Sequence, residues 1–188
     1  MNGRPIVGKI FRLMRSSAVI LACLLLVARL CAQKQKREPL TDAQADQVAA
    51  AGTEPNERVA LYTKFLDEHA ETIKGLTSRV RSAGRSRRLD DELQDFTALM
   101  DELNANLDVY SERKSDIRKA LKPLTEATER WLETLRALSA EPAFELARTE
   151  AIESAEDLAG QAKRLLAEQT EYFKLHKDEQ GQERKVGQ

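Results

Sequence analysis

The chain has 188 residues, of which 41% are hydrophobic, 32% are charged and only 5% are aromatic, and its formal net charge is −1. Eight Gly and five Pro are too few for a collagen-like or low-complexity chain, and the hydrophobic fraction is sufficient to build a core. The length is that of a single domain. Because the chain is not a polycation, we do not expect nucleic acid to be a partner.

Residues 1–32 form the clearest compositional segment, because they contain five basic residues and no acidic one. An apolar run at 18–28 follows the basic residues, and Leu30-Cys31-Ala32 ends with a small residue where a signal peptidase would cut. The run is shorter than the about 20 residues that span a bilayer, and Arg29 follows it. We therefore predict a secretory signal peptide cleaved after about Ala32, and an exported protein in the periplasm or outside the cell.

Three alternatives for this segment stay open, namely an uncleaved membrane anchor, a lipoprotein signal and organellar targeting. Cys23 follows the small Ala22, but the apolar run continues beyond it, and Cys31 follows Leu30, so the lipoprotein pattern is poor. Cleavage after Ala32 removes both Cys, and stability then depends on packing without disulfides. With 25 basic and 31 acidic residues, the remaining chain carries a net charge of −6.

A helical period begins near residue 56. Residues 33–55 lack a sustained period, which predicts a flexible linker, with a short helix over 41–51 as an alternative. A first long helix is predicted over 56–81, because apolar or partly apolar side chains recur at alternating spacings of 3 and 4. Its inner positions are Val59, Tyr62, Leu66, His69, Ile73, Leu76 and Val80.

A second helix is predicted from about residue 87, with Asp90, Asp91 and Glu92 in its first turn. Its inner positions are Leu89, Leu93, Phe96, Met100, Leu103, Leu107 and Tyr110, and the same phase continues through Lys114, Ile117, Leu121, Leu124, Thr128, Trp131, Leu135 and Leu138. The preserved phase favours one helix of roughly 50 residues, kinked near Pro123 because an interior Pro disturbs a helix. A turn at 111–116 or 122–123, which would give four helices, stays open.

A last helix is predicted over 143–176, with inner positions Ala151, Ala155, Leu158, Ala162, Leu165, Gln169 and Tyr172. Residues 177–188 are polar and without a period, which predicts a disordered tail. The predicted fold class is therefore all-α. We expect residues 56–176 to form an elongated antiparallel helical bundle, similar to a coiled coil, with three long helices or four.

The sequence contains no recognisable catalytic or metal-binding motif. His69 and His176 lie on separate predicted helices, no Glu-x-x-His pair is present, and no Ser lies in a Gly-flanked turn. We therefore predict that the protein is not an enzyme, and that it uses no metal, no cofactor and no small-molecule substrate.

The segment 79–88 is the most distinctive local feature, because five of its ten residues are Arg. A guanidinium group binds phosphates and carboxylates in bidentate fashion, so lipid headgroups or wall polymers are candidate ligands. In the alternative interpretation, the same side chains pair with Asp90, Asp91 and Glu92 and bind the last carbonyl groups of the preceding helix. The anion-binding candidates are Arg79, Arg81, Arg85, Arg87 and Arg88.

Two short segments, Glu54-Pro55-Asn56-Glu57-Arg58 and Lys114-Ser115-Asp116-Ile117-Arg118-Lys119, resemble an uncharacterised family of secreted all-helical bacterial proteins over about residues 54–175. The resemblance implies no particular activity. Together these observations predict a non-enzymatic, exported cell-envelope protein with an interaction or scaffolding role, through a protein partner or through self-association. The alternative is an adaptor that binds anionic surfaces through the Arg-rich segment.

Overall fold

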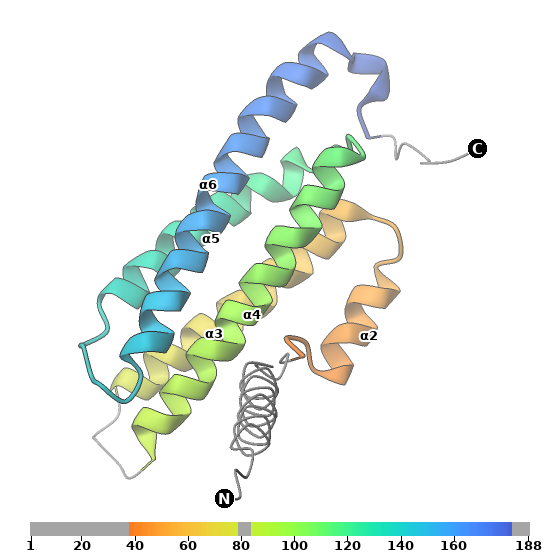
Figure 1. Ribbon diagram of the computed structural model, residues 1–188. Coiled ribbons are helices and arrows are strands. Elements are labelled where there is room, and N and C mark those ends of the chain that lie inside the picture. The colour runs from red at the N-terminus through yellow and green to blue at the C-terminus, as the bar shows by residue number, and fades with distance from the viewer. Residues whose placement is uncertain (1–37, 79–83, 182–188) are drawn as a thin grey trace, which may run out of the picture. The chain divides into compact units, whose positions relative to one another are not determined.

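The computed structural model of the protein describes residues 38–78 and 84–181 (Figure 1). These residues contain no strand, so the all-α class is confirmed. The predicted signal peptide over 1–32 lies outside the described residues, as does Val80. The helices are α2 (Asp42–Ala50), α3 (Pro55–Ser78), α4 (Arg85–Glu112), α5 (Arg118–Arg136) and α6 (Glu145–Leu175), followed by the short 3-10 helix η1 (Lys177–Glu179).

The four long helices pack in a bundle-like arrangement around one hydrophobic core, and the chain reverses direction at each connection (Figure 1). Helix α3 packs against α4 and α5, and α6 packs against the same two helices. Helices α4 and α5 are therefore diagonal partners, although they follow each other in the chain. The short connection between them crosses the bundle diagonally.

The core is built from the predicted inner positions of all four long helices. Leu66, Phe96, Trp131 and Leu158 are each 1% exposed or less. The rings of Phe96 and Trp131 meet edge to face at 5.8 Å between centroids, an arrangement that aromatic pairs favour. Burial of each such side chain contributes about 1.5–3 kcal/mol, so the closed core is the main source of stability.

One inner position of the last helix was predicted incorrectly. Tyr172 is only half-buried, and its neighbour Phe173 is buried instead. The buried stripe advances by four residues from Gln169, whereas the sequence pattern suggested three. The side chain of Tyr172 instead donates a hydrogen bond to Glu179 at 2.8 Å, which holds η1 against the end of α6.

The predicted single helix through residues 87–138 is wrong, because α4 ends at Glu112 and α5 begins at Arg118. Lys114 adopts a left-handed conformation, with φ at 55°. Its N–H donates to the carbonyl of Ser111, and the N–H of Ser115 donates to the carbonyl of Tyr110. These two bonds form a Schellman motif, which usually contains Gly at the left-handed position. The phase is preserved because both helices direct their apolar side chains into the same core.

Pro123 lies inside α5, and the helix continues through it. The break therefore falls before the proline rather than at it. Pro123 is exposed, so its ring does not disturb the packing of the core. The structure accordingly has four long helices, as the alternative with a turn at 111–116 predicts.

Two amide side chains from distant helices secure the connection between α4 and α5. The Asn56 amide donates to the carbonyl of Asp116 at 2.7 Å and accepts from the N–H of Ala120 at 3.1 Å. The Gln169 amide accepts from the N–H of Ile117 at 3.0 Å and donates to the carbonyl of Ser115 at 2.9 Å. Because Ile117 provides no side-chain cap for α5, these amides supply hydrogen bonds to backbone groups at its start, where the N–H of Ala120 also donates to the carbonyl of Ile117.

An ion pair also stabilises this turn. Arg118 donates to both carboxylate oxygens of Asp116, at 2.8 and 2.7 Å, and its guanidinium lies 4.7 Å from the centre of the Phe173 ring. The Arg118 guanidinium holds the pKa of the Asp116 carboxyl below its usual range. The Asp116 side chain therefore favours its ionised form in the folded protein.

The segment before α3 contains the short helix α2, which begins with a capping box formed by Thr41 and Gln44. Val48 is its buried residue, and α2 packs against α3. At the other end of the chain, residues 177–181 are folded back, because the Gln180 amide donates to the carbonyl of Phe173 at 2.8 Å. The remainder of the predicted tail, residues 182–188, lies outside the described residues.

We predict that Asn56→Ala lowers the free energy of unfolding by about 1–3 kcal/mol, because it removes two part-buried hydrogen bonds to the turn and takes the side-chain donor away from the carbonyl of Asp116. Urea denaturation followed by circular dichroism measures this loss. The matched control is Gln94→Ala, whose amide bonds only to Asp90 within α4 and should change stability by less than about 0.5 kcal/mol. Equal losses for the two variants would contradict the assigned role of Asn56.

We further predict that Asp116→Asn destabilises the protein near neutral pH and that its effect diminishes in acid. A carboxyl with a lowered pKa in the folded state contributes stability above its unfolded pKa of about 3.9, and this contribution disappears as the pH falls through the folded value. The difference in unfolding free energy between the wild type and Asp116→Asn should therefore shrink between about pH 6 and about pH 3. A difference that is independent of pH would show that the ion pair contributes nothing.

Candidate anion-binding site

The first turn of α4 is positively charged, against the usual charge preference of a helix N-terminus. Helix α4 begins at Arg85 after the N-cap Gly84, which has φ at 81° and provides no side-chain cap. The prediction that Asp90, Asp91 and Glu92 occupy this turn is wrong, because the helix starts earlier and its first turn contains no acidic residue. Cations here oppose the helix dipole, at a cost of about 0.3–1 kcal/mol each.

Three of the other helices follow the usual charge preference of a helix N-terminus. Helices α2, α3 and α6 each carry an acidic residue in the first turn, namely Asp42, Glu57 and Glu145. Arg148 beside Glu145 holds the pKa of that carboxyl below its usual range. Only α4 and α5 lack an acidic residue in the first turn among the α-helices of residues 38–78 and 84–181.

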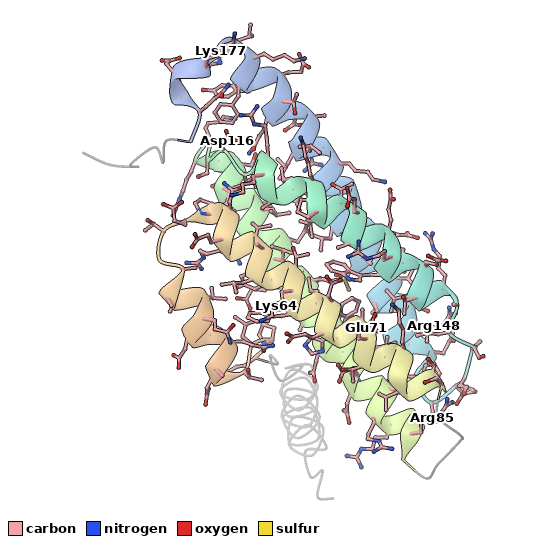
Figure 2. All side chains as sticks on the ribbon, turned by 180° about the vertical axis from the view of Figure 1, so that it is seen from behind. Lys64, Glu71, Arg85, Asp116, Arg148 and Lys177 are labelled. Carbon is pink, nitrogen blue, oxygen red and sulfur yellow. The ribbon has the colours of Figure 1, made fainter. Side chains whose placement is uncertain are left out.

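Arg85 has a different environment from the other candidate arginines, because it is only 8% exposed. Its guanidinium donates to Glu141 at 2.6 Å, and the Ser86 hydroxyl donates to the other carboxylate oxygen at 3.2 Å. This pair ties the start of α4 to the connection between α5 and α6 (Figure 2). Arg85 therefore acts first as a structural residue.

Arg87 and Arg88 are exposed. Neither side chain forms an ion pair or a hydrogen bond with another described residue. Two of the three carboxylates that were their predicted alternative partners contact other residues, since Asp90 accepts from Gln94 at 2.8 Å and Glu92 lies 2.7 Å from the ring nitrogen of His69. Arg79 and Arg81 lie outside the described residues.

A cleft of 890 Å³ lies beside this turn. Basic side chains from three helices, Lys74, Arg85 and Arg130, line it together with Glu133 and Glu141. Three hydroxyl residues and an apolar floor complete the lining: Thr77, Thr134 and Ser139, then Leu89, Ala137, Leu138 and Phe144. Cationic and hydroxyl donors above an apolar floor suit an anionic group with an apolar part.

The sequence did not reveal this cleft, because its basic residues are far apart in the chain. Lys74 and Arg130 have no basic residue next to them in the sequence and belong to no local motif. Another feature near the cleft is Leu146, which lies in the first turn of α6, close to the cleft residue Phe144, and is 73% exposed. A surface that contacts lipid often combines exposed apolar side chains with basic ones.

The two histidines make local contacts. His69 pairs with Glu92 at 2.7 Å and so joins α3 to α4. The ring of His176 stacks on Tyr172 at 4.1 Å. Among the residues that the structure describes, no group of three or more His, Cys, Asp or Glu is placed to hold a metal ion.

None of the described helices combines the length and the apolar character that crossing a membrane requires. Comparison with known proteins found no matching family model, no matching curated protein and no matching solved structure. The function of the protein is therefore inferred from the geometry and charges of the chain itself.

We predict that the Arg85–Glu141 pair contributes a coupling energy of about 1–3 kcal/mol in a double-mutant cycle with Arg85→Gln and Glu141→Gln, because both groups are largely buried. The matched control is the pair Arg136–Glu156, which has the same 2.6 Å separation. Its side chains are much more exposed, at 58% for Arg136 and 50% for Glu156. Its coupling should stay below about 1 kcal/mol. Equal coupling in the two cycles would overturn the structural role of Arg85.

Proposed function

We propose that this is a non-enzymatic, exported cell-envelope protein whose helical bundle has an interaction or scaffolding role. Export is supported by the basic and apolar pattern of residues 1–32. An elongated antiparallel bundle is supported by the lengths of α3, α4 and α6, which are 24, 28 and 31 residues. At 1.5 Å per residue these helices extend roughly 36–46 Å.

Within this role, binding to an anionic surface is the function that the geometry supports best. The observation that carries the proposal is the exposure of Arg87 and Arg88, without partners among the described residues, in a helix turn where cations reduce stability. Local rules are broken most often where function requires it. Lipid headgroups and wall polymers share the phosphate and carboxylate groups that guanidinium binds.

The energies are sufficient for reversible attachment. Each Lys or Arg close to an anionic membrane contributes about 1 kcal/mol, which is comparable to or larger than the cost of placing it against the helix dipole. The cleft beside the turn also contains Lys74 and Arg130, which are about half exposed and pair with Glu71 and Asp67. Several such contributions together give binding that depends on ionic strength, since salt screens exposed charges.

We expect residues 33–188 to sediment as a monomer at low and high salt. The apolar positions of the four long helices are buried within one chain, so they are not available to pair with a second copy. Sedimentation velocity of this fragment checks the expectation. A salt-independent dimer would show that an additional surface drives assembly and would favour a scaffold built from several copies.

We predict salt-sensitive binding of residues 33–188 to vesicles that contain phosphatidylglycerol, and several-fold weaker binding of Arg87→Gln/Arg88→Gln. Two lost charges remove up to about 2 kcal/mol at this surface, which corresponds to at most about 30-fold in affinity. Co-sedimentation with vesicles at several salt concentrations measures both effects, and sedimentation with wall extract tests the other source of the same chemistry. The double variant should be as stable as the wild type or slightly more stable, because it removes cations that oppose the dipole of α4.

The matched control for this experiment is Lys64→Gln/Lys163→Gln, which removes two exposed charges in the middle of α3 and α6, where Lys64 pairs with Glu68 and Lys163 pairs with Glu129. It should bind vesicles like the wild type. Equal binding of the wild type and the Arg87/Arg88 variant, or no binding of the wild type to either vesicles or wall extract, would overturn the proposal.

A further inference from the structure

A second segment of the chain, residues 113–122, is as rich in basic residues as the Arg-rich segment. It contains Arg113, Lys114, Arg118, Lys119 and Lys122, with Asp116 as its only acidic residue. Together, residues 79–88 and 113–122 hold 10 of the 25 basic residues in 33–188, but only one of the 31 acidic residues. The remaining positions of 33–188 therefore contain 15 basic and 30 acidic residues.

Most of these cations are free to bind a ligand. Arg113, Lys119 and Lys122 are exposed and form no ion pair or hydrogen bond through their side chains with the described part of the chain. Lys114 is also exposed, and its ammonium lies 5.8 Å from the centre of the Tyr172 ring. Arg118 is the exception, because it is occupied by Asp116. Glu112 immediately precedes this segment, and its side chain is exposed.

Charge placement at the start of α5 repeats the pattern of α4. Its first turn contains Arg118 and Lys119 and no acidic residue, so the cation of Lys119 opposes the helix dipole without a compensating partner. Its first backbone donors are already satisfied, since Ile117 and Ala120 donate to the Gln169 and Asn56 amides. Any ligand at this surface is therefore bound by side-chain cations and not by the helix terminus.

The described parts of the two basic segments lie at opposite ends of the four-helix unit. Residues 113–122 follow the C-terminus of α4, whereas Arg87 and Arg88 lie at its N-terminus. The 25 residues between Arg88 and Arg113 correspond to roughly 38 Å along the helix. Figure 2 shows Arg85 at one end of the four-helix unit and Asp116 at the other. A leucine is exposed at each end, Leu146 at the first and Leu175, which is 83% exposed, at the second.

We propose that the bundle bridges two anionic lipid surfaces, with one basic end on each. This inference depends on the proposed function, because it assigns a lipid partner to the first basic end and adds a second binding surface. The acidic residues outside the two segments repel an anionic surface, so the chain binds through an end and not along its side. The roughly 38 Å between the ends exceeds the Debye length of about 10 Å at 0.1 M salt, so two bound surfaces do not repel each other strongly across the bundle.

The experiment measures both binding and clustering of vesicles that contain phosphatidylglycerol, using residues 33–188. Co-sedimentation reports binding, and dynamic light scattering reports clustering. The wild type should increase the apparent vesicle size several-fold and then allow it to fall again at excess protein, when each vesicle is covered and no bridge can form. Raising the salt concentration should reverse the clustering.

Two variants each remove two cations from one end: Arg87→Gln/Arg88→Gln and Lys119→Gln/Lys122→Gln. Each should still bind vesicles through its intact end, but neither should cluster them when compared with the wild type at equal amounts of bound protein. The combination of all four substitutions should abolish most of the binding. The matched control, Lys64→Gln/Lys163→Gln, should bind and cluster like the wild type.

The outcomes separate this inference from the proposed function. Binding without clustering, or normal clustering by the Lys119/Lys122 variant, overturns the bridge but leaves the first basic end in place. Absence of binding to vesicles overturns the proposal that the bundle bridges two lipid surfaces. Binding to wall extract alone would leave only the proposed function, attachment to an anionic surface. Thermal unfolding shows whether a variant loses clustering because it is unfolded. The substitution at Lys119 should leave the stability of the protein unchanged or raise it, so a lower unfolding temperature would indicate such damage. Sedimentation of the wild type as a monomer excludes clustering through dimers.

Discussion

The Schellman motif at the end of α4 is the constraint on which the rest of the fold depends. Lys114 takes the left-handed conformation there, and the amides of Asn56 and Gln169 bind backbone groups of the residues that follow it. The reversal places α4 and α5 on a diagonal, where each is covered by both α3 and α6. An unbroken helix would present one continuous apolar stripe to only two shorter helices. The turn therefore closes the core within a single chain.

Because the core is closed, the function of the protein must depend on its surface. The apolar positions that run through the long helices are buried, so the bundle offers mainly a polar surface to its surroundings. On that surface the charges are not evenly spread, because basic residues concentrate in two connections and acidic residues dominate elsewhere in residues 33–188. Long helices then act as spacers that hold the two basic ends apart, and the packing provides the rigidity that such spacing requires.

The first turns of the helices illustrate a balance between stability and surface chemistry. Helices α2, α3 and α6 begin with acidic residues that favour the helix dipole, whereas α4 and α5 begin with cations that oppose it. At Arg85 the unfavourable charge is compensated by Glu141, because a buried cation without a partner would be far more costly. Arg87 and Lys119 have no such partner among the described residues, and water or an external anion stabilises them.

The sequence by itself determined the helical class, the boundaries of α3 and α6 to within a few residues, and about two thirds of the buried positions, because these depend on periodic spacing along one helix. It did not determine the break between α4 and α5. That break uses a lysine where glycine is usual, and its amide partners are more than 50 residues away in the chain.

Only the tertiary structure decided that Arg85 is buried against Glu141 while Arg87 and Arg88 are exposed, and that Lys74 and Arg130 join Arg85 around one cleft. Local patterns encode which face of a helix is apolar. The surroundings of a charge depend on which helices meet there, and that depends on how the chain reverses.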